Sequence, residues 1–130
     1  MQEDLGKLIL RVTVGALLLF HGVHKMLTGI APIEAMVVAH GLPSALAYGV
    51  YLGEVVGPVL VILGLFARIG AALIVVNMVL AVVLAGMSRI AAFDPMGGYA
   101  LQLEAFFLFG ALSIALIGSG RYSIAGGRWN

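Results

Sequence analysis

The chain has 130 residues, of which 62% are hydrophobic and 10% are charged, and its formal net charge is +1 at pH 7. A soluble domain averages roughly 45–50% apolar and about 25% charged residues, so seven basic and six acidic side chains are too few to cover a soluble surface. The lack of a basic run excludes nucleic acid as a partner, and the lack of cysteine excludes disulfides, thiol redox chemistry and iron–sulfur ligation.

Four apolar segments follow one another, each near the roughly 20 residues with which a helix crosses a bilayer. They are residues 8–26, 45–66, 69–87 and 99–118. Runs such as AALIVVNMVLAVVLAG lack the alternation of a membrane β-strand, and helices satisfy their backbone hydrogen bonds internally. The sequence therefore predicts an all-α, integral membrane four-helix bundle that forms one domain over residues 1–130.

The connections between these segments differ in length and composition. The longest contains PIEAMVVAHGLP, in which Pro32 suits the first turn of a helix and Gly41 suits its end. We predict a short helix here that lies at the membrane interface. Only Ala67 and Arg68 separate the second and third segments, so these two spans are expected to form a tight antiparallel hairpin.

The distribution of lysine and arginine predicts the orientation, because cytoplasmic loops carry an excess of them. One side collects Lys7, Arg11, Arg68, Arg121 and Arg128, and the other collects Lys25 and Arg89. This difference predicts that both termini lie in the cytoplasm (N-in/C-in). Tyr122 and Trp129 are expected to act as aromatic anchors at the interface.

Ionisable residues within the apolar segments are candidates for function, because placing them in a membrane is costly. The candidates are Arg11, His21, His24, Lys25, Glu54 and Glu104, with Asn77 and Gln102 as neutral polar partners. His21 follows Lys7, Glu54 precedes Arg68 and Glu104 precedes Gly118 by 14 residues each. At about 1.5 Å per residue, all three lie roughly 21 Å from the cytoplasmic boundary, in the outer half of the membrane.

The same residues allow a purely structural interpretation. Lys25 could pair with either Glu54 or Glu104 and hold the helices together, as polar residues do in membrane bundles. Asn77 is expected to make an interhelical hydrogen bond. Arg11 lies only a few residues from the cytoplasmic edge, and we expect its side chain to snorkel to the interface.

Glu54 has one further feature, which is a proline four residues after it. Pro58 has no backbone N–H, so the carbonyl group of Glu54 loses its helical partner and the helix is expected to kink. A kink beside the only acidic residue of the segment could open a pocket and expose an acceptor next to the carboxylate. An ordinary proline kink of a membrane helix is the alternative.

Three chemistries were compared for these side chains. Haem is disfavoured because His21 and His24 share one segment, whereas axial ligands come from facing helices. A metal site formed by the two histidines with Glu54 and Glu104 has suitable ligand types but no diagnostic spacing, so none is predicted. A quinone needs an apolar slot, hydrogen-bond donors such as His21, His24 or Lys25, and carboxylates that relay protons.

Three segments resemble the DoxX family of small membrane proteins. LILRVTVGALLLFHGVHKM is similar to its first helix, with an arginine before a phenylalanine–histidine–glycine block and a lysine. YLGEVVGPVLVILGLFARIGAAL is similar to its second helix, and GSGRYSIAGG to its closing motif, although the acidic residue that often follows that motif is absent. The similarity extends over nearly the whole chain.

The resemblance implies a four-helix, multi-pass protein of the bacterial inner membrane that is of the oxidoreductase type. Relatives are linked to quinone reduction with thiosulfate as donor, to resistance against quinone or oxidative stress, or to larger membrane complexes. By position it points to Arg11, His21, Gly22, Lys25, Glu54, Arg68, Arg121, Tyr122 and Ser123.

Together these observations predict a quinone-linked oxidoreductase component. His21, Lys25, Glu54 and Glu104 are the expected catalytic residues, and the same set, with His24 in place of Glu104, is expected to contact the quinone. Two alternatives remain. One is a non-catalytic subunit or assembly partner of a larger membrane complex or homo-oligomer, and the other is a small proton-coupled exporter that uses Glu54.

Overall fold

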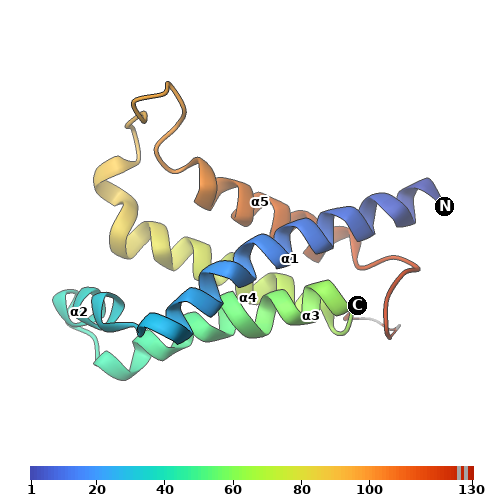
Figure 1. Ribbon diagram of the computed structural model, residues 1–130, viewed down its shortest axis with the longest axis horizontal. Helices are drawn as coiled ribbons and strands as arrows, with labels where there is room; N and C mark the ends of the chain where they lie inside the picture. The colour runs from blue at the N-terminus through green and yellow to red at the C-terminus, as the bar shows by residue number, and fades with distance from the viewer. Residues whose placement is uncertain (126, 128) are drawn as a thin grey trace.

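The computed structural model describes residues 1–125, 127 and 129–130. Gly126 and Arg128 lie outside the described residues, so the contribution of Arg128 to the predicted orientation has no structural counterpart. The regular structure of the described part is helical (Figure 1), apart from one isolated β-bridge between Phe93 and Tyr99. The predicted all-α class is confirmed.

Three helical stretches are long and apolar enough to cross a membrane. The first is α1, Gln2–Thr28, whose 27 residues extend over about 40 Å. The second is Ser44–Leu63 and the third is Ala67–Arg89. They contain most of the first three predicted spans.

The second and third stretches are not uniform α-helices. The second consists of a 3₁₀ segment η1 (Ser44–Gly49), a π-helical turn η2 (Leu52–Val56) and the helix α3 (Gly57–Leu63). The third consists of α4 (Ala67–Ala81), a π-helical turn η3 (Val82–Gly86) and a 3₁₀ turn η4 (Met87–Arg89). Departures from α-geometry inside a helix often lie at functional sites, and η2 contains Glu54.

The fourth predicted span is shorter than expected. The helix α5, Gln102–Ile117, has 16 residues, or about 24 Å, against a hydrocarbon core about 30 Å thick. The residues before it form an irregular loop in which the Asp94 carboxylate accepts hydrogen bonds from the backbone of Met96 and Gly98. Within the described residues, the structure thus has three helices of spanning length and a shorter fourth apolar helix.

A short helix, α2 (Ala31–Ala39), follows α1, with Pro32 in its first turn. This element confirms the predicted helix between the first two spans. Its Val37 is buried in a small apolar cluster with Ile30 and Ala47, which attaches α2 to η1. The short helix therefore covers the end of the molecule opposite the two termini (Figure 1).

The hairpin between the second and third stretches turns earlier in the sequence than predicted. α3 ends at Leu63, and Ala67 already begins α4. The reversal takes place at Gly64 and Phe66, whose φ angles are +70° and +48°. Gly64 ends the helix in the left-handed conformation that is common at helix C-termini.

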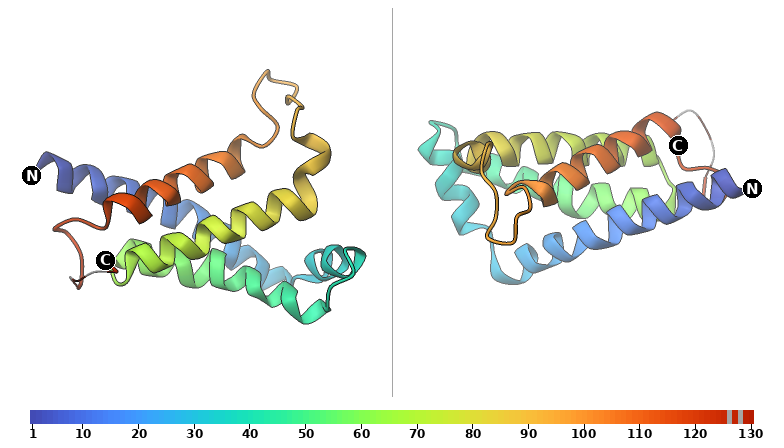
Figure 2. Two further views of the ribbon diagram at one scale, coloured as in Figure 1. Left: turned by 180° about the vertical axis from the view of Figure 1, so that it is seen from behind. Right: turned by 90° about the horizontal axis from the view of Figure 1, so that it is seen from above.

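The main core lies where α1, α3, α4 and α5 meet. α4 contacts both α3 and α5, and α1 contacts the same two helices from the other side, as the views in Figure 2 show. Its fully or nearly buried members are Val14, Leu18, Val61, Ala71, Ile74, Met78, Phe107, Ala111 and Ile114. Small residues at Ala71 and Ala111 allow close approach of the helices.

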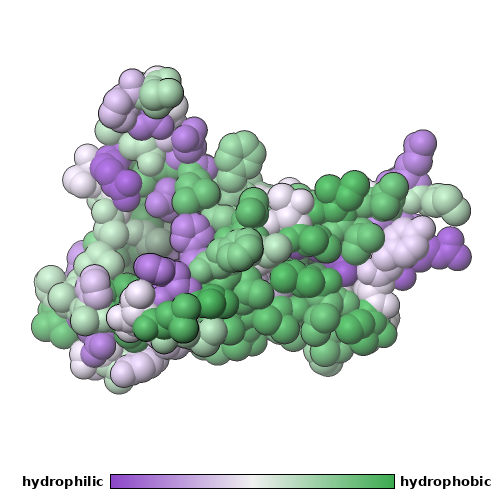
Figure 3. Space-filling model, viewed as in Figure 1, coloured by the Kyte–Doolittle hydropathy of each residue, from purple (hydrophilic) through white to green (hydrophobic). Residues whose placement is uncertain are grey.

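The outer surface of the bundle is hydrophobic. Figure 3 shows a continuous apolar band along the helices, with hydrophilic side chains gathered near the two ends. Phe20, Phe106 and Leu116 are each at least 70% exposed. Such a belt is stable facing lipid and would be unstable facing water. Both termini lie at the same end of the molecule (Figure 1).

Candidate functional site

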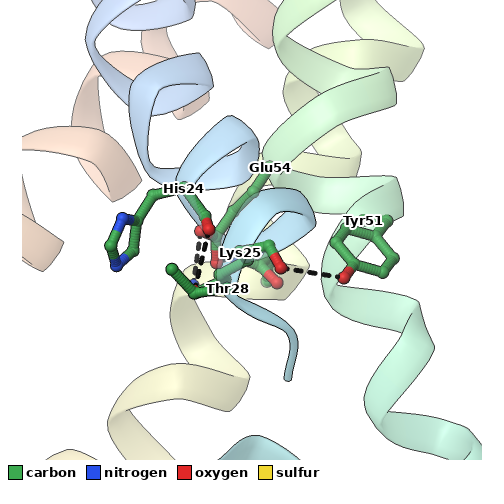
Figure 4. A network of polar contacts seen from close by, with 6 residues as sticks. His24, Lys25, Thr28, Tyr51 and Glu54 are labelled. Atoms are coloured by element: carbon green, nitrogen blue, oxygen red, sulfur yellow. Dashed lines mark hydrogen bonds and ion pairs between the residues drawn. The ribbon is translucent and has the colours of Figure 1, made fainter.

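Three polar side chains from three helical stretches meet inside the bundle. The Lys25 ammonium lies 2.5 Å from Oε1 of Glu54, and the amide of Asn77 donates a hydrogen bond of 3.0 Å to Oε2. The Glu54 side chain is only 6% exposed, whereas that of Lys25 is 27% exposed. Both carboxylate oxygens are therefore occupied, and the ammonium is the more accessible partner. Figure 4 shows Lys25 beside Glu54.

The π-helical turn η2 places Glu54 in this position. Pro58 has no N–H to give to the Glu54 carbonyl, and the N–H of Gly57 instead bonds the carbonyl of Leu52, which is the wider spacing of a π-helix. The sequence predicts a disturbed helix here, and the structure shows a π-turn. The Glu54 carbonyl oxygen points at Gly22 of α1, where an added Cβ would come closer than 3.0 Å to it.

Contacts from residues next to Glu54 also hold Lys25 and Asn77. The Tyr51 hydroxyl donates a hydrogen bond of 3.2 Å to the carbonyl of Lys25 near the end of α1. Gly53 lies against Asn77, since a Cβ at this glycine would overlap the Asn77 side chain. The absence of a side chain at Gly22 and Gly53 thus permits α1 and α4 to approach η2 from both sides.

The polar cluster forms one wall of a cavity of about 380 Å³. Apart from Lys25, Glu54 and Asn77, the residues that line it are apolar and come from α2, η1, η2, α4 and η3. Ile33 and Met36 of the short helix cover one side of it. A single ion pair in an otherwise apolar chamber is typical of a binding site for a small apolar molecule with few polar atoms.

The other predicted site residues lie outside this cavity. The ring of His21 packs edge-on against Phe107 of α5, with 6.0 Å between ring centroids. His24 is exposed and turns away from Tyr51 and Glu54 (Figure 4). Glu104 is half-buried in the first turn of α5 and has no hydrogen bond or ion pair within the described part of the chain.

The structure therefore resolves which glutamate pairs with Lys25, and it is Glu54. The expected interhelical hydrogen bond of Asn77 is confirmed, and its acceptor is the same carboxylate. Among residues 1–125, 127 and 129–130, no three histidine or acidic side chains gather closely enough to hold a metal ion. His21, His24 and Glu104 keep their suggested roles as predictions.

The prediction for Arg11 was wrong. Its side chain is 1% exposed and turns into the protein instead of reaching the interface. It donates hydrogen bonds of 2.9 and 3.0 Å to the carbonyls of Val61 and Ile62, and of 2.7 and 2.8 Å to those of Ser119 and Tyr122. These acceptors include the last turn of α3, whose unpaired carbonyls and negative dipole end favour a cation.

Sequence reasoning missed the structural roles of Tyr51 and of the covering helix. Tyr51 precedes Glu54 by three residues and so shares its helix face, which is a signal that could have been used. The contribution of Ile33 and Met36 to the cavity wall depends on the path of the loop between the first two spans, which no local pattern reveals.

Comparison with known proteins supports the resemblance found in the sequence. The DoxX family model matches residues 6–87, a segment that contains Lys25, Glu54 and Asn77, whereas Glu104 and Arg121 lie beyond it. No curated protein and no solved structure shows a significant match. Since the matched segment covers more than half of the 130 residues, the chain belongs to the DoxX family of membrane proteins.

Proposed function

We propose that this protein is the quinone-binding component of an oxidoreductase system and that the cavity beside Glu54 holds the quinone head group. The observation that carries the proposal is the combination of an apolar chamber with one lysine–glutamate pair on its wall. A quinone ring is flat and apolar, with two carbonyl oxygens that need donors. A cavity of about 380 Å³ lies within the usual range for small-molecule sites.

Lys25 is the group best suited to meet a quinone oxygen. An ammonium has three donor hydrogens, and in the described structure Glu54 accepts one of them. The remaining donors are available to a ligand, and the partial exposure of the side chain leaves room for it to turn toward the cavity. Glu54 holds the ammonium in place and is the nearest carboxylate that could exchange a proton with the bound ring.

Reduction of a quinone takes up two electrons and two protons and converts both carbonyl groups to hydroxyl groups. In our proposal a two-electron reductant outside this chain supplies the electrons, because a chain without cysteine offers no thiol or iron–sulfur donor. Glu54 and Lys25 act on the protons.

The location follows from the same proposal. With five basic residues assigned to one side and two to the other, the positive-inside rule favours an orientation with both termini in the cytoplasm. We propose the bacterial inner membrane as the location of the chain. A four-helix arrangement in which α5 also crosses the bilayer completes this topology. The cavity then lies in the outer half of the membrane, where a lipid-soluble quinone is present.

Glu54→Gln is expected to weaken quinone binding by at least about tenfold, or roughly 1.4 kcal/mol. The glutamine keeps the shape of the side chain but removes the charge that orients Lys25 and the group that exchanges protons. The measurement is titration of the purified protein with a short-chain ubiquinone, together with mass spectrometry of the lipids that copurify. Glu34→Gln is the matched control, because Glu34 is a half-buried acid of α2 with no described polar partner.

A double variant separates binding from helix pairing. Lys25→Met alone leaves a buried carboxylate without its cation and should destabilise the protein, whereas Lys25→Met with Glu54→Leu removes both charges and should recover most of the thermal stability. Quinone binding should stay lost in the double variant. If wild-type protein binds no quinone, or the double variant binds it normally, the pair serves only to join the helices and the proposal fails.

A further inference from the structure

A second groove begins near the two termini and runs along α4 toward the cavity beside Glu54. It has a volume of about 550 Å³ and runs between α4 and α5. Its lining is apolar except at one end, where Arg68 lies, and it is formed by Arg68, Ile69, Ala72, Leu73, Val76, Ala115 and Trp129. The groove is separate from the polar cluster of Lys25, Glu54 and Asn77.

Arg68 has unused capacity to bind an anion. Its Nη1 donates to the carbonyls of Ala115 and Leu116, at 3.2 and 3.3 Å, at the end of α5. Its Nε is buried and is the one such side-chain atom in residues 1–125, 127 and 129–130 without a hydrogen-bond partner. Within the same residues no carboxylate lies at ion-pair distance from it. The buried Nε is out of reach of a ligand, but the side chain as a whole is half-buried, and the positive charge of its guanidinium attracts an anion in the groove.

The apolar part of the groove continues directly from this guanidinium. Arg68, Ala72 and Val76 follow one another at intervals of four residues and share one face of α4. The eight steps along the helix from Arg68 to Val76 extend over about 12 Å. The small side chains of Ala72 and Ala115 leave the depression open between the two helices. The groove therefore has a guanidinium at one end and an apolar track that is long enough to hold part of a fatty-acid chain.

We propose that this groove binds an anionic phospholipid, with the phosphate on Arg68 and one acyl chain along Ala72 and Val76. A guanidinium matches phosphate oxygens with paired N–H donors. Arg68 is the second residue of α4, and the positive dipole end of that helix adds to the attraction. Basic pockets between membrane helices bind lipid head groups in this way, and Trp129 lies where an aromatic anchor meets the head-group region.

The proposal does not depend on quinone binding. Leu73 and Val76 line both the groove and the cavity beside Glu54, so a bound acyl chain would support one wall of that cavity. Phosphate chemistry alone would also admit a free phosphate ion. The apolar track distinguishes the two ligands, because only a lipid would use it.

The test compares lipids that differ only in head-group charge. Phosphatidylglycerol, added to the delipidated protein in detergent, should raise the unfolding temperature, as any ligand of the native state does. Phosphatidylcholine with the same chains, and inorganic phosphate, should raise it far less. In Arg68→Gln, about ten times more phosphatidylglycerol should be needed for the same rise in unfolding temperature. Arg121→Gln, at an exposed arginine at the same end, should respond to the lipid as the wild type does.

A second variant keeps the test decisive if Arg68→Gln does not fold. Ala72→Trp fills the track at an exposed position and retains Arg68, and it should abolish the difference between the two lipids. The proposal is overturned if both lipids stabilise the protein equally, if inorganic phosphate suffices, or if the phosphatidylglycerol effect persists in Ala72→Trp. If Arg121→Gln lost as much of the phosphatidylglycerol effect as Arg68→Gln, the effect would be a general response to surface charge, and the proposal would be overturned too.

Discussion

Replacing Arg11 by methionine is expected to destabilise the protein by about 4 kcal/mol or more. The substitution removes four charge-assisted hydrogen bonds, each of the kind worth about 1.5–3 kcal/mol, although such contributions are not additive. It also leaves the carbonyls of Val61, Ile62, Ser119 and Tyr122 without that donor in the protein interior. The measurement is the unfolding temperature in detergent together with the yield of folded protein.

Two further variants show whether the stability that Arg11 contributes comes from the geometry of its donors or from its charge. Arg11→Lys keeps the positive charge but cannot direct donors at four carbonyls, and we expect it to recover only a small part of the lost stability. Arg121→Met removes an exposed arginine whose side chain has no described contact and should change stability by less than about 0.5 kcal/mol. Wild-type stability in Arg11→Lys would contradict the assigned role of the guanidinium.

Gly22→Ala is expected to destabilise the protein by about 3 kcal/mol and to disturb the site directly. The added methyl group would lie closer than 3.0 Å to the Glu54 carbonyl oxygen and carbon. These are backbone atoms that cannot turn aside, so α1 must move away from η2, with the penalty of an overpacked core. Because Lys25 lies one turn further along α1, this movement should also lengthen its contact with Glu54 and weaken quinone binding.

Gly6→Ala is the matched control, since Gly6 lies in the same helix and a Cβ there meets nothing within 4 Å. Alanine has the higher helix propensity, so this variant should be as stable as the wild type or more stable by up to about 1 kcal/mol. Circular dichroism and thermal unfolding of both variants under the same conditions provide the comparison. Equal stability of Gly22→Ala and the wild type would show that α1 does not need this close approach.

These two residues fix α1 against the second helical stretch at two different heights. Arg11 binds the end of α3 through its side chain, and Gly22 admits the carbonyl of Glu54 through the lack of one. Together the two contacts set how far α1 lies from Ser44–Leu63 and how it is rotated about its axis. That geometry places Lys25 beside Glu54, so the position of the site depends on the distant contacts of Arg11 as well as on the close approach at Gly22.

The sequence alone predicted the helical class, the short helix after the first span and four membrane spans, of which the structure bears out three as long enough to cross a membrane. These features follow from the length and continuity of apolar runs, which depend on the solvent that each segment meets and not on its partners. It also offered the pairing of Lys25 with a glutamate as a structural alternative, and it predicted that Asn77 would bond another helix. A charge or amide inside an apolar span needs a partner wherever the span lies.

Only the tertiary structure decided which partners these are. The choice of Glu54 over Glu104, the placement of His21 against Phe107, and the burial of Arg11 all depend on how the helices are rotated about their axes. The acceptors of Arg11 lie 50 to 111 residues away in the sequence and are backbone carbonyls, which every residue carries. No residue pattern can therefore mark them, and helix packing brings them to the guanidinium.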